Sequence, residues 1–163
     1  MESKLEIRLT NDWDAEQIKE LHDLTVETSN GIWAPNIVGE EILYYDNYGA
    51  FDEGKLVGLS GILYRKNEEC ELERHARILG ISRDNLCEIF AFVHPDYKRM
   101  GLSTELVRII TEHLHSLGVD VYAVAKPENV SNKIVEKLRF SQIGGQYKDK
   151  DGITRQLWLD PAP

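Results

Sequence analysis

Strands are the clearest signal in the pattern of apolar and polar positions. Residues 5–10 (LEIRLT) alternate as a half-buried strand does, and residues 49–64 predict two strands joined by a tight turn. Residues 86–93 and 119–125 are almost continuously apolar and rich in aromatic or β-branched side chains. Such runs are typical of central strands covered on both faces. Two final segments, FSQIGGQY and ITRQLWLD, predict a closing hairpin.

Helices are predicted where apolar residues recur every three or four positions. This spacing occurs in residues 15–25, which follow a capping sequence, and again in residues 102–117. Shorter helices are predicted for residues 38–45 and 131–138. The charged stretch 67–85 also has apolar residues at helical intervals, which indicates a short surface helix or a long excursion.

These elements occur in the order β α α β β β α β α β β, with the excursion before the fourth strand. The order predicts an α/β protein with a mixed sheet, and the length of 163 residues predicts a single domain over residues 1–163. Apolar residues make up 42% and charged residues 29% of the chain, which is ordinary for a globular protein. No run is apolar over the roughly 18 residues that a membrane span needs, and the N-terminus lacks a signal-peptide core. We therefore expect a cytoplasmic protein.

Charge and metal-binding residues narrow the classes of partner. The net charge is −9, which argues against a nucleic acid or an anionic membrane as partner. It fits a cationic partner only weakly, because many proteins are acidic for solubility alone. The two cysteines are too few for a disulfide framework, and the five histidines show no ligand spacing, so no metal site is predicted.

The segment VHPDYKRMGLSTELV carries the most specific chemistry in the chain. It leads from an apolar strand through a turn into a helix, whose first N–H groups lack partners within the helix and attract anions. Gly101 would let a phosphate approach the backbone, while Lys98 and Arg99 add positive charge. Ser103 and Thr104 add hydroxyl donors. Alone, such a pattern is more often only a turn, and it is neither a P-loop nor a dinucleotide-binding fingerprint.

This segment resembles the acetyl-CoA-binding motif of the GCN5-related N-acetyltransferase (GNAT) family. In the family a V-x-P-x-Tyr/Phe turn precedes Gln or Arg, two variable residues, Gly, a variable residue, and Gly or Ala; KRMGLS takes these six positions, with Lys98 and Ser103 as departures. ENVSNKIVEKLRF is similar to the second motif of the family, with Arg139 in place of the usual glycine. KLVGLSGIL and RLTNDWDAEQI resemble the third strand and the first strand and helix. The resemblance therefore covers nearly the whole chain.

The resemblance implies a GNAT-like fold whose fourth and fifth strands splay apart around acetyl-CoA. Acetyl-CoA would be the acyl-donor substrate, no metal would be involved, and a longer acyl donor stays open. The implied cofactor-binding residues lie on the fourth strand, in the turn and in the second motif: Phe92, Val93, Lys98, Arg99, Met100, Gly101, Leu102, Ser103, Thr104, Asn129 and Asn132.

The resemblance also implies the chemistry. An amine attacks the thioester carbonyl, and a backbone N–H near Phe92 or Val93 can stabilise the oxyanion that forms. Glu88 is the candidate base, because it is the only carboxylate in strand 86–93 and family members often use a glutamate there. The alternative for Glu88 is a carboxylate in water at the start of the strand.

The general acid is less defined than the base. Many family members carry a tyrosine in the helix of the second motif, where this chain has Val135. A proton from solvent is one alternative, since a CoA thiolate is a tolerable leaving group. Three tyrosines are candidate substitutes, with packing or rim positions as the other reading: Tyr97, Tyr122 and Tyr147.

We therefore expect an N-acetyltransferase that acts by direct attack of a primary amine on acetyl-CoA. The acceptor, which the sequence does not identify, would be a small-molecule amine or an amine of a protein or peptide, and homodimerisation, common in the family, is open. The alternative is a non-catalytic acyl-CoA-binding regulatory module. The excursion 67–85, rich in glutamate in its first half, is expected to border the acceptor entrance, or else to be a solvated helix without substrate contact.

Overall fold

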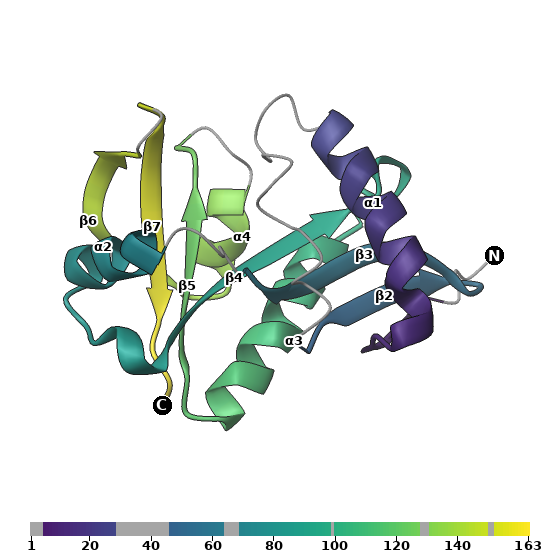
Figure 1. Ribbon diagram of the computed structural model, residues 1–163, viewed down its shortest axis with the longest axis horizontal. Coiled ribbons are helices and arrows are strands. Elements are labelled where there is room, and N and C mark those ends of the chain that lie inside the picture. Colours follow the sequence, from purple (N-terminus) through teal and green to yellow (C-terminus); the bar gives the residue numbers. More distant parts are fainter. Residues whose placement is uncertain (1–4, 29–45, 64–68, 99, 128–130, 150–151) are drawn as a thin grey trace. The chain divides into compact units, whose positions relative to one another are not determined.

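The computed structural model describes residues 5–28, 46–63, 69–98, 100–127, 131–149 and 152–163 (Figure 1). The chain forms two compact units. Unit 1 comprises Met1–Tyr64 and Phe90–Ile110, and unit 2 comprises Arg65–Ile89 and Thr111–Pro163. The helix predicted for residues 38–45 lies outside the described residues, and the assignment of residues 1–163 to one domain stays a prediction.

Seven strands follow the order β1-β2-β3-β4-β5-β7-β6, in which β4 is common to both units. In unit 1, β1 (Leu5–Leu9) pairs antiparallel with β2 (Tyr48–Asp52), and β2 pairs antiparallel with β3 (Lys55–Ile62). The residues between β2 and β3 are Glu53 and Gly54, which both have positive φ, as the tightest hairpin turns require. The two strands predicted for residues 49–64 are confirmed.

Unit 2 contains the pairings of β4 with β5, of β5 with β7 and of β6 with β7. The parallel pair consists of β4 (Leu86–Val93) and β5 (Asp120–Ala125), whereas β7 (Thr154–Asp160) is antiparallel to β5 and to β6 (Ser141–Lys148). The β4–β5 ladder spans Leu86–Glu88 of β4 only. The ladder thus covers only the first part of β4, and the splay implied for the carboxyl ends of the two strands stays a prediction.

One helix that covers the sheet of unit 1 is α1 (Ala15–Thr28), which lies along β2 and β3 (Figure 1). It follows the short 3-10 helix η1 (Asp12–Asp14). Asp14 stabilises this helix start, because its carboxylate accepts a hydrogen bond from the backbone N–H of Asn11 at 2.8 Å. It also accepts two hydrogen bonds from the Arg8 guanidinium at 2.9 and 3.2 Å. The apolar face of α1 packs on the strands through these buried residues: Ile18, Leu21, Phe51, Leu56, Leu59, Phe90 and Phe92.

The charged excursion of the sequence contains α2 (Glu69–Leu79) and the 3-10 helix η3 (Arg83–Asn85). The helical interpretation of this stretch is confirmed. The helix α2 packs on β6 and β7, and Ala76 and Leu79 are buried with Leu157 and Leu159 of β7. One face of α2 is therefore part of the core of unit 2, rather than a fully solvated surface.

Two further helices follow strands β4 and β5. The 3-10 helix η4 (Pro95–Tyr97) leads towards α3 (Leu102–Ser116), and α4 (Ser131–Lys137) follows β5. Past α4, Phe140 N–H donates to Val135 O at 2.9 Å and Arg139 N–H to Glu136 O at 3.0 Å. This is the double bond pattern of a Schellman motif, and it places Arg139 at φ 69°, in the left-handed region that favours glycine.

The described structure confirms a mixed α/β fold of the expected class. It adds α2, which the predicted order counted only as an excursion. None of the helices in the described ranges is both long and apolar enough to cross a membrane.

Candidate functional site

The turn between β4 and α3 has the geometry of an anion-binding helix start. Glu105 N–H donates to Gly101 O at 3.2 Å, which is the first bond of the helical ladder. The amides of Leu102, Ser103 and Thr104 precede this ladder, so they have no acceptor within the helix. These donors, with the positive end of the helix dipole, favour a negatively charged ligand.

Gly101 leaves the backbone of this turn open. Its φ is 73°, it is exposed, and a Cβ atom placed on it would meet no neighbouring atom within 4 Å. A phosphate can therefore approach the peptide planes here, whereas a side chain would fill this space.

The predicted binding residues around Gly101 differ in exposure. Lys98 is exposed and Met100 is 54% exposed, so both are accessible to a ligand. Leu102 is buried against Leu106 and Val57, and only its backbone amide can serve a ligand. Arg99 and Asn129 lie outside the described residues.

A carboxylate stands near this helix start, but it is paired. Glu105 in the first turn of α3 forms an ion pair with Arg108 one turn later. The hydrogen bond from Arg108 lowers the pKa of Glu105. Because the guanidinium balances this charge, Glu105 opposes an incoming anion less than an isolated carboxylate would.

The end of β4 distinguishes the two predicted backbone donors. His94 N–H donates to Val57 O of β3 at 2.8 Å. Backbone N–H groups alternate in direction along a strand, so the Val93 N–H points away from β3 and the Phe92 N–H towards it. Val93 is therefore the better candidate for an oxyanion donor. The side chain of Phe92 is buried and stacks on Phe90 at a centroid distance of 5.3 Å.

Glu88 is buried within the sheet of unit 2. Glu88 is only 7% exposed. The alternative interpretation, a carboxylate in water at the start of the strand, is therefore wrong. Glu88 is the register partner of Tyr122 on β5, and the Tyr122 hydroxyl lies 3.4 Å from Glu88 Oε2. Burial together with a neutral hydrogen-bond donor is an environment in which a carboxylate can exchange a proton.

A histidine that sequence reasoning missed adjoins this pair. His75 of α2 is 1% exposed, and its Nδ1 lies 2.9 Å from the Tyr122 hydroxyl. Its Nε2 lies 2.8 Å from the hydroxyl of Tyr147 on β6. Four side chains from α2, β4, β5 and β6 are thus joined by hydrogen bonds. The only signal in the sequence was a histidine one position before the apolar Ala76 of an otherwise charged helix.

The three tyrosines proposed as substitute acids have different surroundings. Tyr122 is 1% exposed and Tyr147 is half-buried, and both belong to the cluster around His75. Tyr97 donates its hydroxyl to Asp52 Oδ2 at 2.5 Å in unit 1. This hydrogen bond is the main reason that the pKa of Tyr97 is raised. The Asp52 bond uses the one proton of Tyr97, as the bond to Glu88 uses that of Tyr122.

Asn132 of the second motif makes its described hydrogen bonds at the start of α4. Asn132 Nδ2 donates to the carbonyls of Lys126 and Pro127 at 2.6 and 3.0 Å, and its Oδ1 accepts from Trp158 Nε1 at 2.9 Å. Asn132 therefore holds Lys126 and Pro127, which follow β5, and a direct role towards a cofactor stays a prediction. Val135 is buried, so its position offers no polar group for catalysis.

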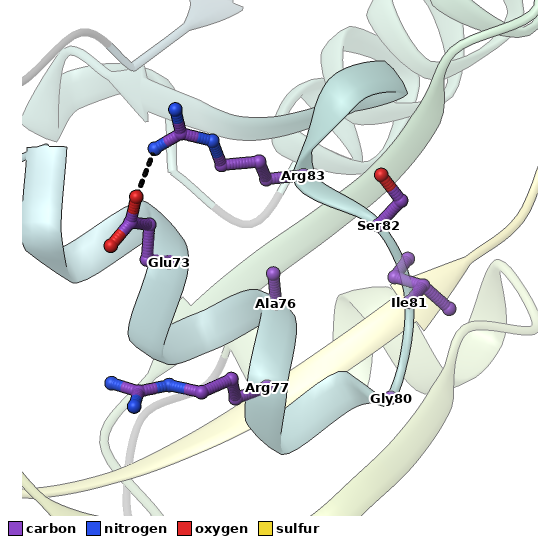
Figure 2. Close-up of a pocket in the computed structure, with 7 residues that line it drawn as sticks. All are labelled: Glu73, Ala76, Arg77, Gly80, Ile81, Ser82 and Arg83. Atoms are coloured by element: carbon purple, nitrogen blue, oxygen red, sulfur yellow. Dashed lines mark hydrogen bonds and ion pairs between the residues drawn. The ribbon is translucent and has the colours of Figure 1, made fainter.

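A shallow hollow lies elsewhere on unit 2, at the end of α2 (Figure 2). Its volume is about 480 Å³, and an ion pair between Glu73 and Arg83 lies at its side. None of the predicted site residues lines it. Within the described ranges, no group of three or more His, Cys, Asp or Glu residues is placed to hold a metal ion.

Comparisons with known proteins agree with this geometry. The family model described as "Acetyltransferase (GNAT) family" matches residues 8–140, which include the turn at Gly101 and the start of α4. The chain belongs to the GNAT acetyltransferase family. No curated protein sequence matches it.

Several solved acetyltransferases share the GNAT fold of this chain at low sequence identity. An N-acetyltransferase from Staphylococcus aureus Mu50 is 12% identical with a TM-score of 0.74, covering 99% of this chain and 100% of its own. Ribosomal-protein-alanine N-acetyltransferase from Brucella melitensis is 17% identical with a TM-score of 0.73 and coverages of 96% and 99%. A phosphinothricin acetyltransferase from Sinorhizobium meliloti, solved with acetyl-CoA, is 16% identical with a TM-score of 0.70 and coverages of 97% and 88%.

Proposed function

We propose that this GNAT protein transfers the acetyl group of acetyl-CoA to a primary amine. The observation that carries the proposal is the start of α3, where Gly101 leaves the backbone open and three amides lack acceptors within the helix. These features fit the pyrophosphate of a coenzyme A ester. The GNAT family match over residues 8–140 supports the acyl-transfer chemistry.

The residues of the chain divide the work of this reaction. Bound acetyl-CoA would supply an activated acetyl group, and the turn from Lys98 to Thr104 would hold its phosphates. The Val93 N–H, which points away from β3, would donate to the carbonyl oxygen as negative charge develops there. Glu88 would take the proton that an ammonium group, with a free pKa near 10.4 for a lysine-like amine, must lose before attack.

The acceptor is proposed by class only. Negative net charge and an acidic excursion suit a cationic amine, on a small molecule or on a protein or peptide. Two solved GNAT structures are named for acceptors of both kinds, a ribosomal-protein alanine and phosphinothricin. Peptides with an amino-terminal alanine and phosphinothricin therefore belong in the first acceptor panel, beside polyamines, aminoglycosides, lysine peptides and free amino acids.

The test is the release of free thiol from acetyl-CoA in the presence of each amine. At least one amine class should raise the rate well above that of acetyl-CoA without amine. Acetyl-CoA should also raise the melting temperature, since a ligand at 100 times its Kd stabilises by about 2.7 kcal/mol. No thermal shift at millimolar acetyl-CoA would contradict the proposal.

A second candidate function is an acyl-CoA-binding regulatory module without turnover. It is favoured by Val135, which is buried where many GNAT proteins carry a catalytic tyrosine. A thermal shift with acetyl-CoA but no thiol release with any amine would support this second function over the first.

A further inference from the structure

The exposed turn that starts α3 has an anchor on each side in unit 1. Gly101 is exposed with open space around it, whereas Tyr97, just before the turn, and Leu102, the first residue of α3, pack into one apolar cluster. Leu102 is 6% exposed in this cluster, and Tyr97 is half-buried. The position of the Gly101 backbone therefore depends on how firmly these two residues are held.

Tyr97 is held by a polar contact as well as by packing. Its hydroxyl donates to Asp52 Oδ2 at 2.5 Å, and its ring meets the His94 ring edge to face at a centroid distance of 5.8 Å. Its backbone is also fixed, because Tyr97 N–H donates to His94 O at 2.9 Å within η4. The bond to Asp52 ties this short helix to a residue 45 positions earlier in the chain.

Asp52 is a rigid partner for this bond. It is the last residue of β2, which lies between β1 and β3, and its register partners are Leu5 and Lys55. The tight turn of Glu53 and Gly54 follows it directly. A backbone that is paired on both sides has little freedom to move, so the Asp52 carboxylate offers the Tyr97 hydroxyl an acceptor in a fixed place.

We propose that Tyr97 and Asp52 are positioning residues for the anion-binding turn, and that their hydrogen bond holds the amides at the start of α3 in the arrangement that receives phosphate. Without the bond, the turn would have to be ordered when the ligand binds, and this ordering would lower the affinity. The identity of the ligand rests on the proposed function, whereas the anchoring of the turn does not. This role differs from that of a general acid, because the hydroxyl acts through the position of the turn.

The charge of this anchor acts against an anionic ligand, so position and charge predict opposite results. The pKa of Tyr97 is raised first by the hydrogen bond to Asp52 and by burial, and then by the negative charges of Asp52, Asp96 and Glu53. These carboxylates would repel a phosphate group. A role of Asp52 through charge alone therefore predicts tighter binding when Asp52 is removed, and a role through position predicts weaker binding.

The binding test is the Kd for coenzyme A, measured by calorimetry without an acceptor amine. Tyr97→Phe keeps the ring and removes only the hydroxyl, and it should raise the Kd about five- to tenfold, because a hydrogen bond to a charged group is lost. Asp52→Ala should raise the Kd to a similar extent, and Asp52→Asn, which keeps an oxygen acceptor, should restore most of the affinity. The double variant Tyr97→Phe/Asp52→Ala should bind no more weakly than the weaker single variant, since both changes break the same bond.

Gln17→Ala is the matched control, because Gln17 of α1 binds the same β2–β3 hairpin. Its Oε1 accepts from Leu56 N–H at 2.9 Å, and its Nε2 donates to Gly54 O at 3.3 Å. This variant should lose stability in urea unfolding and keep the wild-type Kd. An unchanged Kd in folded Tyr97→Phe, or a Kd raised equally in Gln17→Ala, would overturn the positioning role. Tighter binding in Asp52→Ala would overturn it as well.

The structural test measures the motion of the turn by nitrogen-15 relaxation and needs no ligand. In the wild-type protein the order parameters of Gly101, Ser103 and Thr104 should be about 0.85, as in a rigid backbone. Tyr97→Phe should lower them towards about 0.6, whereas Ile109 in the middle of α3 should stay rigid in both proteins. Equal order parameters at the turn in both proteins would contradict anchoring by this bond.

The two tests separate this inference from the proposed function. If coenzyme A does not bind the wild-type protein, the proposed function fails, and the order parameters alone decide whether Asp52 and Tyr97 anchor the turn. If coenzyme A binds but its Kd and the order parameters ignore Tyr97→Phe, the proposed function stands and the inference about the anchor fails.

Discussion

Asp14 in unit 1 and Glu88 in unit 2 are both buried carboxylates, but the donors of their described hydrogen bonds differ in kind. Asp14 accepts two hydrogen bonds from a guanidinium, and these bonds lower its pKa. Glu88 meets the neutral phenol of Tyr122. A carboxylate bonded to a cation is strongly held in its charged form, and it acts as a structural anchor. A phenol donor holds a carboxylate in its charged form less strongly than a guanidinium does, which suits the proposed role of Glu88 as a base.

The largest expected effect is on kcat, which should fall when Glu88 is replaced but not when Asp14 is replaced. Glu88→Gln should lower kcat at neutral pH by about 10²- to 10⁴-fold, the usual loss when a general base is removed. The loss should shrink as the pH approaches the pKa of the acceptor amine, because a neutral amine needs no base. Thiol release measured across the pH range tests this expectation.

Asp14→Asn is the matched control for this substitution. It makes the same chemical change at the other buried carboxylate and should leave kcat per folded molecule close to wild type. Wild-type rates at all pH values in Glu88→Gln would assign Glu88 to a structural role like that of Asp14.

The next effect separates donor binding from base chemistry. Gly101→Glu places a side chain and a negative charge where phosphates should approach, so the Kd for acetyl-CoA should rise by about 100-fold or more, equivalent to about 2.7 kcal/mol. Calorimetric titration measures this change. In Glu88→Gln the Kd should stay near wild type, so the two variants should fail at different steps.

Gly118→Glu controls for backbone strain in the Gly101 experiment. Gly118 follows α3 with φ 75° and open space around it, close to the values at Gly101. Both variants should lose similar stability, but only Gly101→Glu should lose acetyl-CoA. An unchanged Kd in folded Gly101→Glu would show that the cofactor binds elsewhere.

The stability of unit 1 should reveal the anchoring role of Asp14. Its pKa is lower in the folded protein than in the unfolded chain, so its stabilisation is present above about pH 4 and is lost as the pH falls through the folded pKa. Asp14→Asn should cost about 2 kcal/mol at pH 7, the range for a hydrogen bond to a charged group, and less at acid pH. Urea unfolding at both pH values tests this, with the exposed neighbour variant Asp12→Asn expected within about 0.5 kcal/mol of wild type.

The smallest expected effect is on stability, at Arg139, which follows α4. Arg139 is exposed and adopts φ 69°, where glycine is less strained. Arg139→Gly should therefore stabilise the protein by about 0.5 to 1 kcal/mol without changing kcat. Arg139→Ala keeps the Cβ atom and should give no gain, and a gain equal to that of glycine would point away from backbone strain.

The parts of the site built from consecutive residues could be predicted from the sequence. The turn at Gly101 is such a part, because a strand, a glycine and a helix start follow one another in one short segment. Glu88 was also predictable, since it is a charge within an apolar strand. In both cases the local pattern contains the physical reason for the structure.

The network around Glu88 could not be predicted in the same way. Its members come from four separate elements, and His75 and Tyr122 are 47 positions apart. His75 follows Arg74 in a charged helix, so its position looked solvated. The choice between Phe92 and Val93 as backbone donor was equally hidden, because it depends on which strand edge each N–H faces.

The hydrogen bonds of His75 also bear on how α2 finds its place during folding. The apolar positions Leu72, Ala76 and Leu79 repeat at helical spacing, so a slip of the helix by one turn would still bury aliphatic groups. The same slip would carry the imidazole away from both tyrosines and would break its two hydrogen bonds to their hydroxyls, each worth about 0.5–1.5 kcal/mol. The two hydrogen bonds of His75 therefore favour one alignment of α2 over other alignments that would bury a similar apolar surface.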